Sequence, residues 1–348
     1  MKTVFEYPAE LGRLSVLPRV RLFAGPTPLE AMPNLARSCG GGPLLVKRDD
    51  CMGLAFGGNK VRQLEFYIGE ADAQNADTVL ITGAVQSNFV RLAAAAARKA
   101  GMECHIQLEE RVAKSDATYR NSGNVLLDRL LGATLHSYAH GEDEAGADKR
   151  LGEIAEDLRQ SGRRPYIIPL APGHTPLGAL GYVVAADELI RQIAEAGLEV
   201  EEIVVASGSG NTHAGLLFGL RALGSDIVVT GICVRRDASA QHPRIAARCR
   251  EIADLLEIES KVEDADIRVN DFFLPPGYGT AGEETLRAIL LAARTEALML
   301  DTTYTGKAMA GFIDRARKAG GGTRIFVHTG GTPAIFAYEK ELTEAAGR

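Results

Sequence analysis

The sequence predicts an α/β protein with two lobes, each built on a mainly parallel open sheet covered by helices. Short runs rich in Val, Ile and Leu alternate with longer runs rich in Ala, Leu and Glu, an order typical of β–α–β units. Several short runs, such as TVLIT at 78–82, are apolar throughout, as expected for strands buried on both faces. The length of 348 residues exceeds the roughly 250–300 residues at which one core usually stops growing, which favours two lobes or an insertion.

Each predicted element follows from these two patterns. The apolar, β-branched runs predict strands over 44–47, 78–82, 104–108, 166–170, 203–206, 227–234 and 324–328. The longer runs predict helices over 60–74, 88–100, 121–131, 144–160, 177–196, 212–223, 244–257, 283–294, 307–318 and 333–342. Loops are predicted over 109–119, 139–147 and 269–282.

Composition narrows the classes of partner. Asp and Glu (45) outnumber Lys and Arg (39), for a net charge of −6, so no domain-wide positive field exists to neutralise nucleic-acid phosphates. The five cysteines form no Cys-x-x-Cys pair, which favours reduced thiols in a reducing compartment. No apolar run reaches the about 20 residues of a membrane span, and Glu6 and Pro8 interrupt any signal peptide. We expect a cytoplasmic protein that binds neither nucleic acid nor membrane.

Glycine and polar side chains occur together at four predicted strand ends, 56-FGGNKVR-62, 82-TGAVQSN-88, 206-ASGSGNTHAG-215 and 328-HTGGTP-333. Ligands of open α/β sheets bind at the carboxyl ends of strands, so four such segments predict one composite ligand site.

The 206–215 segment follows a strand and opens a helix, where backbone N–H groups can bind an anion. The third glycine of a dinucleotide fingerprint is replaced by His213, and no Gly-Lys-Ser/Thr of a P-loop is present. The loop therefore suits a single phosphate group, although such turns also occur without ligands.

Lys60 begins a predicted helix directly after Gly57, Gly58 and Asn59. A cation is unfavourable at the positive end of a helix dipole, and this effect lowers an amine pKa toward the range needed for Schiff-base chemistry. The alternative is an exposed lysine beside Arg62.

A reactive lysine beside a cradle for one phosphate suggests pyridoxal 5'-phosphate (PLP), whose ring is an electron sink. The chain resembles the fold type II, tryptophan-synthase-β-like PLP enzymes, and within them the family of D-cysteine desulfhydrase, L-cysteate sulfo-lyase and 1-aminocyclopropane-1-carboxylate deaminase. Matching motifs cover nearly the whole chain: 26-PTPLE-30, 47-KRDD-50, 57-GGNK-60, 86-QSN-88, 178-GALGY-182, 207-SGSGNTHAG-215, 277-GYG-279, 303-TYTGKAMAG-311 and 328-HTGGTPA-334.

This resemblance implies roles for cofactor-binding residues. Lys60 would form the covalent link to the cofactor, Asn88 would hydrogen-bond the ring hydroxyl, and Thr329 would meet the pyridine nitrogen. The phosphate would be held by Ser209, Gly210, Asn211 and Thr212. We expect 1–58 and 176–348 to form the large cofactor-binding domain and 59–175 to form a smaller inserted α/β domain.

The same resemblance implies roles toward the substrate. Ser87 and Asn88 would receive its carboxylate, while Tyr278 and Tyr304 would face it as a hydroxyl pair able to orient it or pass protons. Phe89 stands where relatives usually place a polar residue, commonly His, so one donor to the substrate is lost. Each of these residues could instead have a purely structural role.

Two further positions bear on the reaction. A neutral Thr329 makes the ring a weaker electron sink, which suits prompt loss of a good leaving group from Cβ. Related cyclopropane deaminases carry an acidic residue after the tyrosine, where this chain has Thr305, so we rank β-elimination above cyclopropane opening. Gln63 stands where relatives often have a phosphate-side lysine, so phosphate binding would rely more on backbone amides.

His174 and His213 flank the predicted site, but neither has a second ligand at metal spacing. We expect local hydrogen bonding from both and no metal site. The acidic stretch 142–148 is predicted to be a solvated helix start.

The leading hypothesis is a PLP-dependent β-elimination lyase that acts on a cysteine-like amino acid and releases pyruvate, ammonia and sulfide or sulfite. Two alternatives remain, 1-aminocyclopropane-1-carboxylate deamination and a non-catalytic cofactor- or phosphate-ligand-binding protein. A homodimer is expected by resemblance only. The enantiomer, the leaving group and the proton carrier on each face stay open.

Overall fold

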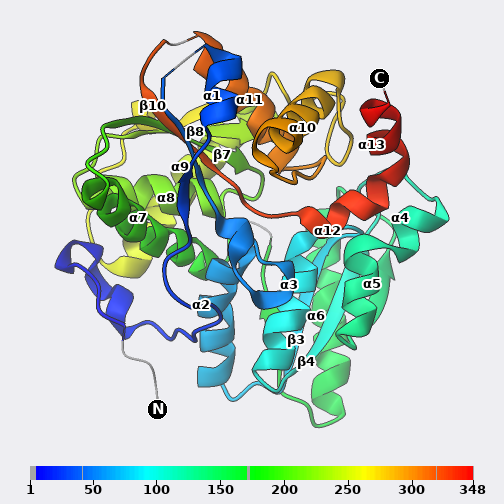
Figure 1. Cartoon of the computed structure of the whole chain (residues 1–348). Helices are drawn as coiled ribbons and strands as arrows, with labels where there is room; N and C mark the ends of the chain where they lie inside the picture. Colours follow the sequence, from blue (N-terminus) through cyan, green and yellow to red (C-terminus); the bar gives the residue numbers. More distant parts are fainter. Residues whose placement is uncertain (1–4, 41, 171–172, 319, 348) are drawn as a thin grey trace.

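The computed structural model describes residues 5–40, 42–170, 173–318 and 320–347, and it contains two separate sheets with helices around them (Figure 1). The large sheet has the strand order β1-β2-β10-β7-β8-β9. Its strands are β1 (Leu29–Ala31), β2 (Leu44–Lys47), β10 (Thr323–Val327), β7 (Val200–Ser207), β8 (Val228–Cys233) and β9 (Arg268–Asn270). All of its pairings are parallel except β1 with β2.

The small sheet has the order β5-β4-β3-β6, and all of its pairings are parallel. Its strands are β3 (Thr78–Ala84), β4 (Glu103–Glu109), β5 (Thr134–Tyr138) and β6 (Pro165–Ile168). The predicted fold class, two mainly parallel open sheets covered by helices, is therefore confirmed.

The strands that the sequence missed, β1, β5 and β9, are all edge strands. Their residues are only half-buried or exposed, whereas every residue of the central strands β2 and β3 is buried. A strand covered on one side needs no continuous apolar run, so these three lack the signal that revealed the others.

The α-helices are α1 (Pro33–Cys39), α2 (Lys60–Ala73), α3 (Asn88–Lys99), α4 (Ala117–Asn121), α5 (Gly123–Leu130), α6 (Glu144–Gln160), α7 (Leu177–Glu195), α8 (Asn211–Ala222), α9 (Ala238–Leu256), α10 (Glu283–Glu296), α11 (Thr305–Lys318), α12 (Thr332–Ile335) and α13 (Glu339–Ala346). Short 3₁₀ segments lie at η1 (Ala9–Val16), η2 (Asp49–Cys51), η3 (Leu54–Phe56), η4 (Asp264–Asp266) and η5 (Phe336–Tyr338). None of the helices in the described ranges is long and apolar enough to cross a membrane.

Three helix predictions need correction. The helix predicted over 121–131 begins at Gly123 as α5, because Ser122 is extended, and α4 lies mostly in the segment predicted as a loop over 109–119. The helix predicted from 244 begins at Ala238, because the Asp237 side chain caps it by accepting the Ala240 N–H. The helix predicted over 333–342 is divided into α12 and α13 by the 3₁₀ turn η5.

The C-terminal segment runs back across the small-sheet side of the molecule (Figure 1). Helix α12 and turn η5 pack on α4 and α5, where Tyr119 and Tyr338 meet edge to face with ring centroids 5.7 Å apart. We propose domain boundaries at 58/59 and 175/176, because each sheet takes its strands from one side of them.

Candidate active site

The main cavity opens at the carboxyl ends of strands from both sheets. Its atom-free space, open mouth included, is about 510 Å³. It is lined by Asn59, Lys60, Ser87, Asn88, Phe89, Ala206, Gly208, Ser209, Gly210, Thr212, His213, Asp301, Tyr304 and Thr329. All four glycine and polar segments of the sequence thus contribute to one site, as the composite-site prediction requires.

Lys60 is the first residue of α2, and its amine lies 5.1 Å from the centroid of the Phe89 ring. The described residues supply no charged partner for it, and burial lowers its pKa to about 8. The direction of this pKa shift matches the prediction, although its physical cause is burial rather than the helix dipole. The amine is therefore partly neutral and nucleophilic near neutral pH.

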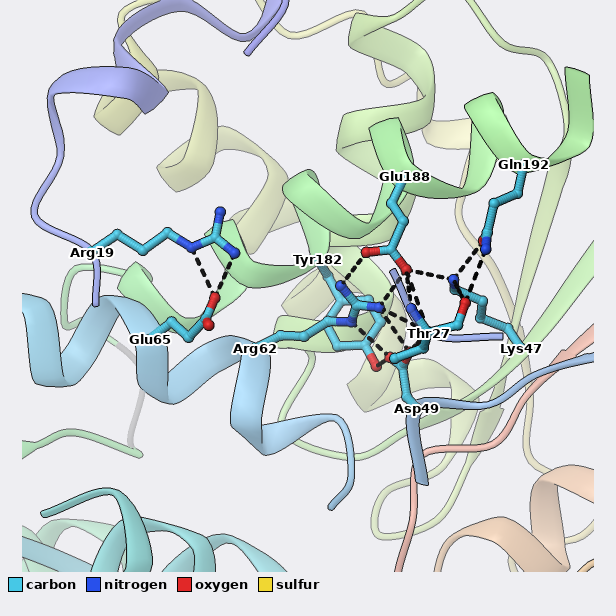
Figure 2. A network of polar contacts seen from close by, with 9 residues as sticks. All are labelled: Arg19, Thr27, Lys47, Asp49, Arg62, Glu65, Tyr182, Glu188 and Gln192. Atoms are coloured by element: carbon cyan, nitrogen blue, oxygen red, sulfur yellow. Dashed lines mark hydrogen bonds and ion pairs between the residues drawn. The ribbon is translucent and has the colours of Figure 1, made fainter. Parts of the chain in front are cut away.

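A network of largely buried charges around Arg62 anchors helix α2, which begins at Lys60 (Figure 2). Arg62 donates to Asp49 and to Glu188, and the Tyr182 hydroxyl donates to Asp49. Lys47 pairs with Glu188. We call these residues, together with Thr27 and Gln192, the Arg62 network. It ties α2 to α7 and to the end of β2, and it contains residues of the motifs at 26–30, 47–50 and 178–182.

The anion cradle lies where β7 passes into α8. Gly210 takes φ +102° at the N-terminus of α8, a conformation that glycine adopts without strain. The Thr212 hydroxyl oxygen accepts from Asn59 Nδ2 at 2.8 Å and from Gln63 Nε2 at 3.0 Å. Because both acceptor positions are occupied, its hydrogen is free to be donated into the cavity.

Most predicted phosphate residues line this cradle. The Asn211 side chain is the exception: it does not line the cavity and lies beside Tyr67. Asn211 is the first residue of α8, so its N–H is one of the unpaired donors at that helix end. Gln63 is fully buried and acts through Thr212.

Ser87 and Asn88 lie at the start of α3. Ser87 Oγ caps this helix by accepting the N–H groups of Phe89 and Val90 at 3.2 and 3.5 Å, which leaves the hydroxyl hydrogen for a ligand. Asn88 Oδ1 accepts from Asn124 Nδ2 at 2.9 Å, and this bond directs the opposite amide NH₂ away from Asn124. The arrangement suits a ligand that carries negative charge at the N-terminus of a helix.

Tyr304 and Tyr278 form a hydroxyl pair, with their oxygens 2.5 Å apart. Burial, reinforced by Tyr278, raises the pKa of Tyr304 well above its ordinary value, so its hydroxyl stays protonated. Asp301 holds the turn over residues 301–304 in place, because its Oδ1 accepts the N–H of Thr303 at 2.7 Å and also that of Tyr304. Thr305 is fully buried and bonds to Asp301, and it does not line the cavity.

Thr329 lines the cavity and is 7% exposed. Among the described residues its hydroxyl has no hydrogen-bond partner, while its carbonyl accepts the Asn59 N–H at 3.1 Å. Contact with a pyridine nitrogen remains a prediction.

An adjoining pocket shares the walls of the cavity at Lys60, Ser87, Phe89, Gly208, Ser209 and Tyr304. Its other lining residues are Gly83, Ala84, Leu170, Tyr278, Arg111, Arg235 and Arg244. We call it the arginine pocket. Tyr278 lines this second pocket and is not among the lining residues of the first cavity.

Neither flanking histidine forms part of a metal site in the described residues, where no group of three or more His, Cys, Asp or Glu side chains could hold an ion. His213 is fully buried, pairs with Ser207 Oγ at 3.1 Å, and is kept neutral because burial lowers its pKa to about 4. His174 is half-exposed beside Asp148. The five cysteines are free thiols.

Sequence reasoning missed several residues of the site. Asn124 and Asp301 orient Asn88 and Tyr304 from outside the four glycine segments, and no local pattern marks them. Asn59 was visible inside GGNK but received no role. The three arginines of the arginine pocket are far apart in the sequence, and only their shared pocket brings them together.

These residues fit PLP. A cradle of backbone amides and the Thr212 hydroxyl suits one phosphate, a buried amine with a lowered pKa suits an aldehyde, and the Asn88 amide can donate to a ring hydroxyl. The roles follow from the chemistry of the donor set, and each stays a prediction for the individual residue.

Comparisons with known proteins agree with this site. The family described as "Pyridoxal-phosphate dependent enzyme" matches residues 20–330. Proteins named D-cysteine desulfhydrase are 42% identical in Klebsiella pneumoniae (strain 342) and 40% identical in Salmonella choleraesuis (strain SC-B67), both over 95% of this chain and 99% of the relative. A solved structure described as an ACC deaminase homologue has a TM-score of 0.87 and 36% identity, covering 98% of this chain and 100% of its own.

Proposed function

The chain belongs to the pyridoxal-phosphate dependent enzyme family and is a PLP-dependent deaminating lyase of the carbon–sulfur class, and from that premise we propose that it acts on a cysteine-like amino acid. D-cysteine is the first candidate, because the proteins that match 95% of the chain carry the name D-cysteine desulfhydrase. The products would be pyruvate, ammonia and a sulfur leaving group.

The observation that carries the proposal is the state of Lys60. Its amine lines the cavity between the phosphate cradle and the start of α3, with a pKa of about 8 and no charged partner in the described ranges. PLP, when bound, supplies an electron sink beside the substrate Cα. Lys60 would hold the cofactor covalently, and its released amine is a suitable base for the Cα proton.

The start of α3 would orient the substrate. The Ser87 hydroxyl hydrogen, at the N-terminus of this helix, can bind the α-carboxylate, while Asn88, fixed by Asn124 at 2.9 Å, would face the ring hydroxyl. Holding the Cα–H bond in one orientation contributes to rate through geometry.

The tyrosine pair would serve the opposite side of the substrate. Because Tyr304 stays protonated, its resting state is a proton donor and not a base. A proton could pass along the Tyr278–Tyr304 hydrogen bond of 2.5 Å to the departing group.

Borohydride reduction of the holoenzyme followed by peptide mapping tests the proposal. We expect a single reduced adduct at Lys60, and we expect Lys60→Ala to lose both the visible absorbance and pyruvate release. Lys307 is a matched internal control, because burial lowers its pKa to about 8 as well, yet its amine donates to the carbonyls of Leu274 and Gly277. An adduct at position 307, or none, would refute the proposal.

A product assay separates the remaining alternatives. Pyruvate release from D-cysteine, L-cysteine or L-cysteate would support β-elimination, whereas 1-aminocyclopropane-1-carboxylate would release 2-oxobutyrate. Release of 2-oxobutyrate alone would favour cyclopropane opening. A bound cofactor without any keto acid product would indicate a non-catalytic binding protein.

We also propose a cytoplasmic homodimer. Four of the five free thiols are buried, which suits a reducing compartment. Light scattering at micromolar concentration should give twice the 37.1 kDa mass of one chain, and a monomer mass would contradict the dimer.

A further inference from the structure

The arginine pocket concentrates positive charge next to the reacting amine. Arg111, Arg235 and Arg244 line it, and no carboxylate is among the described residues of its wall. The side chains of these arginines are 9%, 10% and 12% exposed. Burying a cation is costly unless a counter-charge accompanies it, so the way in which each arginine is paired decides what the pocket can bind.

Arg111 comes from the loop after β4 and is held from behind by Glu109. Its Nε and Nη2 donate to the two Glu109 oxygens at 2.8 Å each, which leaves Nη1 available. Arg111 also lies close enough to Tyr278 and Tyr304 for its charge to lower the pKa of Tyr304 against the effect of burial. Its guanidinium therefore stands at the substrate end of the pocket.

Arg235 and Arg244 share one carboxylate with a third arginine. Glu144, at the start of α6, accepts from Arg235 Nη1 at 2.8 Å and from Arg236, and lies 3.9 Å from Arg244 Nη1. Glu142 is the only other acidic contact in the described part of this cluster, and it is 74% exposed. Burial, together with Arg236, lowers the pKa of Arg244 to about 10. Arg244 Nε also donates to the Ser209 carbonyl at 2.9 Å. Three guanidinium groups thus share one half-buried carboxylate.

The α-carboxylate of an amino acid does not need this charge. On the proposed function, it is already bound by Ser87 and the N-terminus of α3, on another wall of the same space. A second anionic group on the substrate would instead lie against the guanidinium groups, which bind tetrahedral and planar oxyanions through several N–H donors at once.

We propose that the arginine pocket is an oxyanion subsite for the β-substituent, so that the preferred substrate carries a sulfonate on Cβ. This assignment rests on the proposed lyase activity, and it puts cysteate ahead of D-cysteine as the candidate substrate. A base removes the Cα proton, the Cβ–S bond breaks, and its electron pair leaves with sulfite. The unsaturated product takes up water, so cysteate and water give pyruvate, hydrogen sulfite and ammonium without an oxidant or reductant.

Adjacent arginines allow a matched test. Arg235→Gln removes a guanidinium group from the wall of the arginine pocket. Arg236→Gln removes a guanidinium group that also binds Glu144 but is not part of the pocket wall. We expect the holoenzyme to turn over one enantiomer of cysteate with at least tenfold higher kcat/KM than the same enantiomer of β-chloroalanine, whose substituent is uncharged. Arg235→Gln should reduce this ratio about tenfold or more, the usual scale for a hydrogen bond to a charged group. Arg236→Gln should keep the ratio within about twofold.

Calorimetric titration with methanesulfonate provides a readout that is independent of turnover. The holoenzyme should bind it, and Arg235→Gln should weaken binding about tenfold. If that variant does not fold, Arg244→Gln serves instead, because it removes another wall residue and leaves Arg235 on Glu144. Equal losses for cysteate and β-chloroalanine would overturn the subsite, since the arginines would then act on a feature common to both substrates.

Two more outcomes are decisive. Faster turnover of O-phosphoserine than of cysteate would overturn the assignment to a sulfonate. Methanesulfonate binding without pyruvate from any amino acid, and without a borohydride adduct at Lys60, would refute the proposed function while retaining the anion subsite.

Discussion

The Arg62 network and the arginine pocket both bury arginines beside carboxylates, but they balance charge differently. In the Arg62 network two cations, Lys47 and Arg62, face two carboxylates, Asp49 and Glu188. Burial alone would raise the pKa of Asp49, yet Arg62 holds it below its ordinary value. At the arginine pocket, the wall residues Arg235 and Arg244 share Glu144 with Arg236, which lies outside the wall.

The two regions also differ in what they enclose. In the Arg62 network, hydrogen bonds to Thr27, Tyr182 and Gln192 complete the ion pairs (Figure 2). The arginine pocket borders open space next to Lys60. A balanced, satisfied cluster fixes the position of a helix, whereas an unbalanced cluster beside a cavity can be completed by a ligand. Charge balance together with adjoining space therefore separates a structural ion cluster from a candidate binding site.

The largest expected effect comes from breaking the balanced cluster. Arg62→Gln should lower the free energy of unfolding by about 3–5 kcal/mol, because it leaves buried carboxylates without their partner. Denaturant unfolding of the holoenzyme measures this. Arg235→Gln is the control and should cost about 1 kcal/mol or less, because Glu144 keeps two other arginines. Equal losses in the two variants would remove the distinction between the regions.

The next effect contrasts an unpaired buried lysine with a paired one. Only the neutral amine attacks an aldehyde, so the rate at which apoenzyme recombines with PLP should rise about tenfold per pH unit up to about pH 8 and then level off, following the Lys60 pKa of about 8. Stopped-flow absorbance measures this rate. Lys47, which is held by Glu188, should form no adduct with PLP in the same samples. A rate that keeps rising to pH 10 would indicate a lysine with its ordinary pKa of 10.5.

Salt should affect the two regions unequally. Raising KCl from about 0.1 M to about 1 M shortens the Debye length from about 10 Å to about 3 Å, and buried pairs are screened least. Methanesulfonate affinity should therefore fall about fivefold by calorimetry. The difference in unfolding free energy between wild type and Arg62→Gln should change by less than about 0.5 kcal/mol. The opposite pattern would contradict the assignment of the two roles.

The smallest expected effect comes from removing the carboxylate that the arginines share. Glu144→Gln removes the carboxylate that the three arginines share, so methanesulfonate should bind about threefold more tightly, the scale of a partly exposed ion pair. Glu156→Gln is the control on the same helix, because Glu156 contacts the exposed side chains of Arg159 and Gln160 and lies outside the arginine cluster. Weaker binding by Glu144→Gln would show that Glu144 positions the arginines for the ligand.

The predictions made from the sequence were correct where a signal was local. The central strands β2 and β3 were predicted because burial on both faces demands apolar runs, and β1, β5 and β9 were missed because edge strands do not. The lining residues Lys60, Ser87 and Ser209 were found because each lies in a glycine and polar segment at a strand end. Asn124 lies in no such segment, and it contributes to the site through one hydrogen bond to Asn88.

Sequence patterns alone predict the two-sheet α/β class, the four loops that converge on one ligand site and the lysine that enters it, because periodicity and glycine-rich strand ends are properties of neighbouring residues. The balance of charges in each cluster depends instead on the folded structure. Lys60 owes its lowered pKa to burial, and the arginine pocket exists because Arg111, Arg235 and Arg244, from separate segments, meet around a shared space. Desolvation and Coulomb energies depend on distances through space, and no spacing along the chain encodes them.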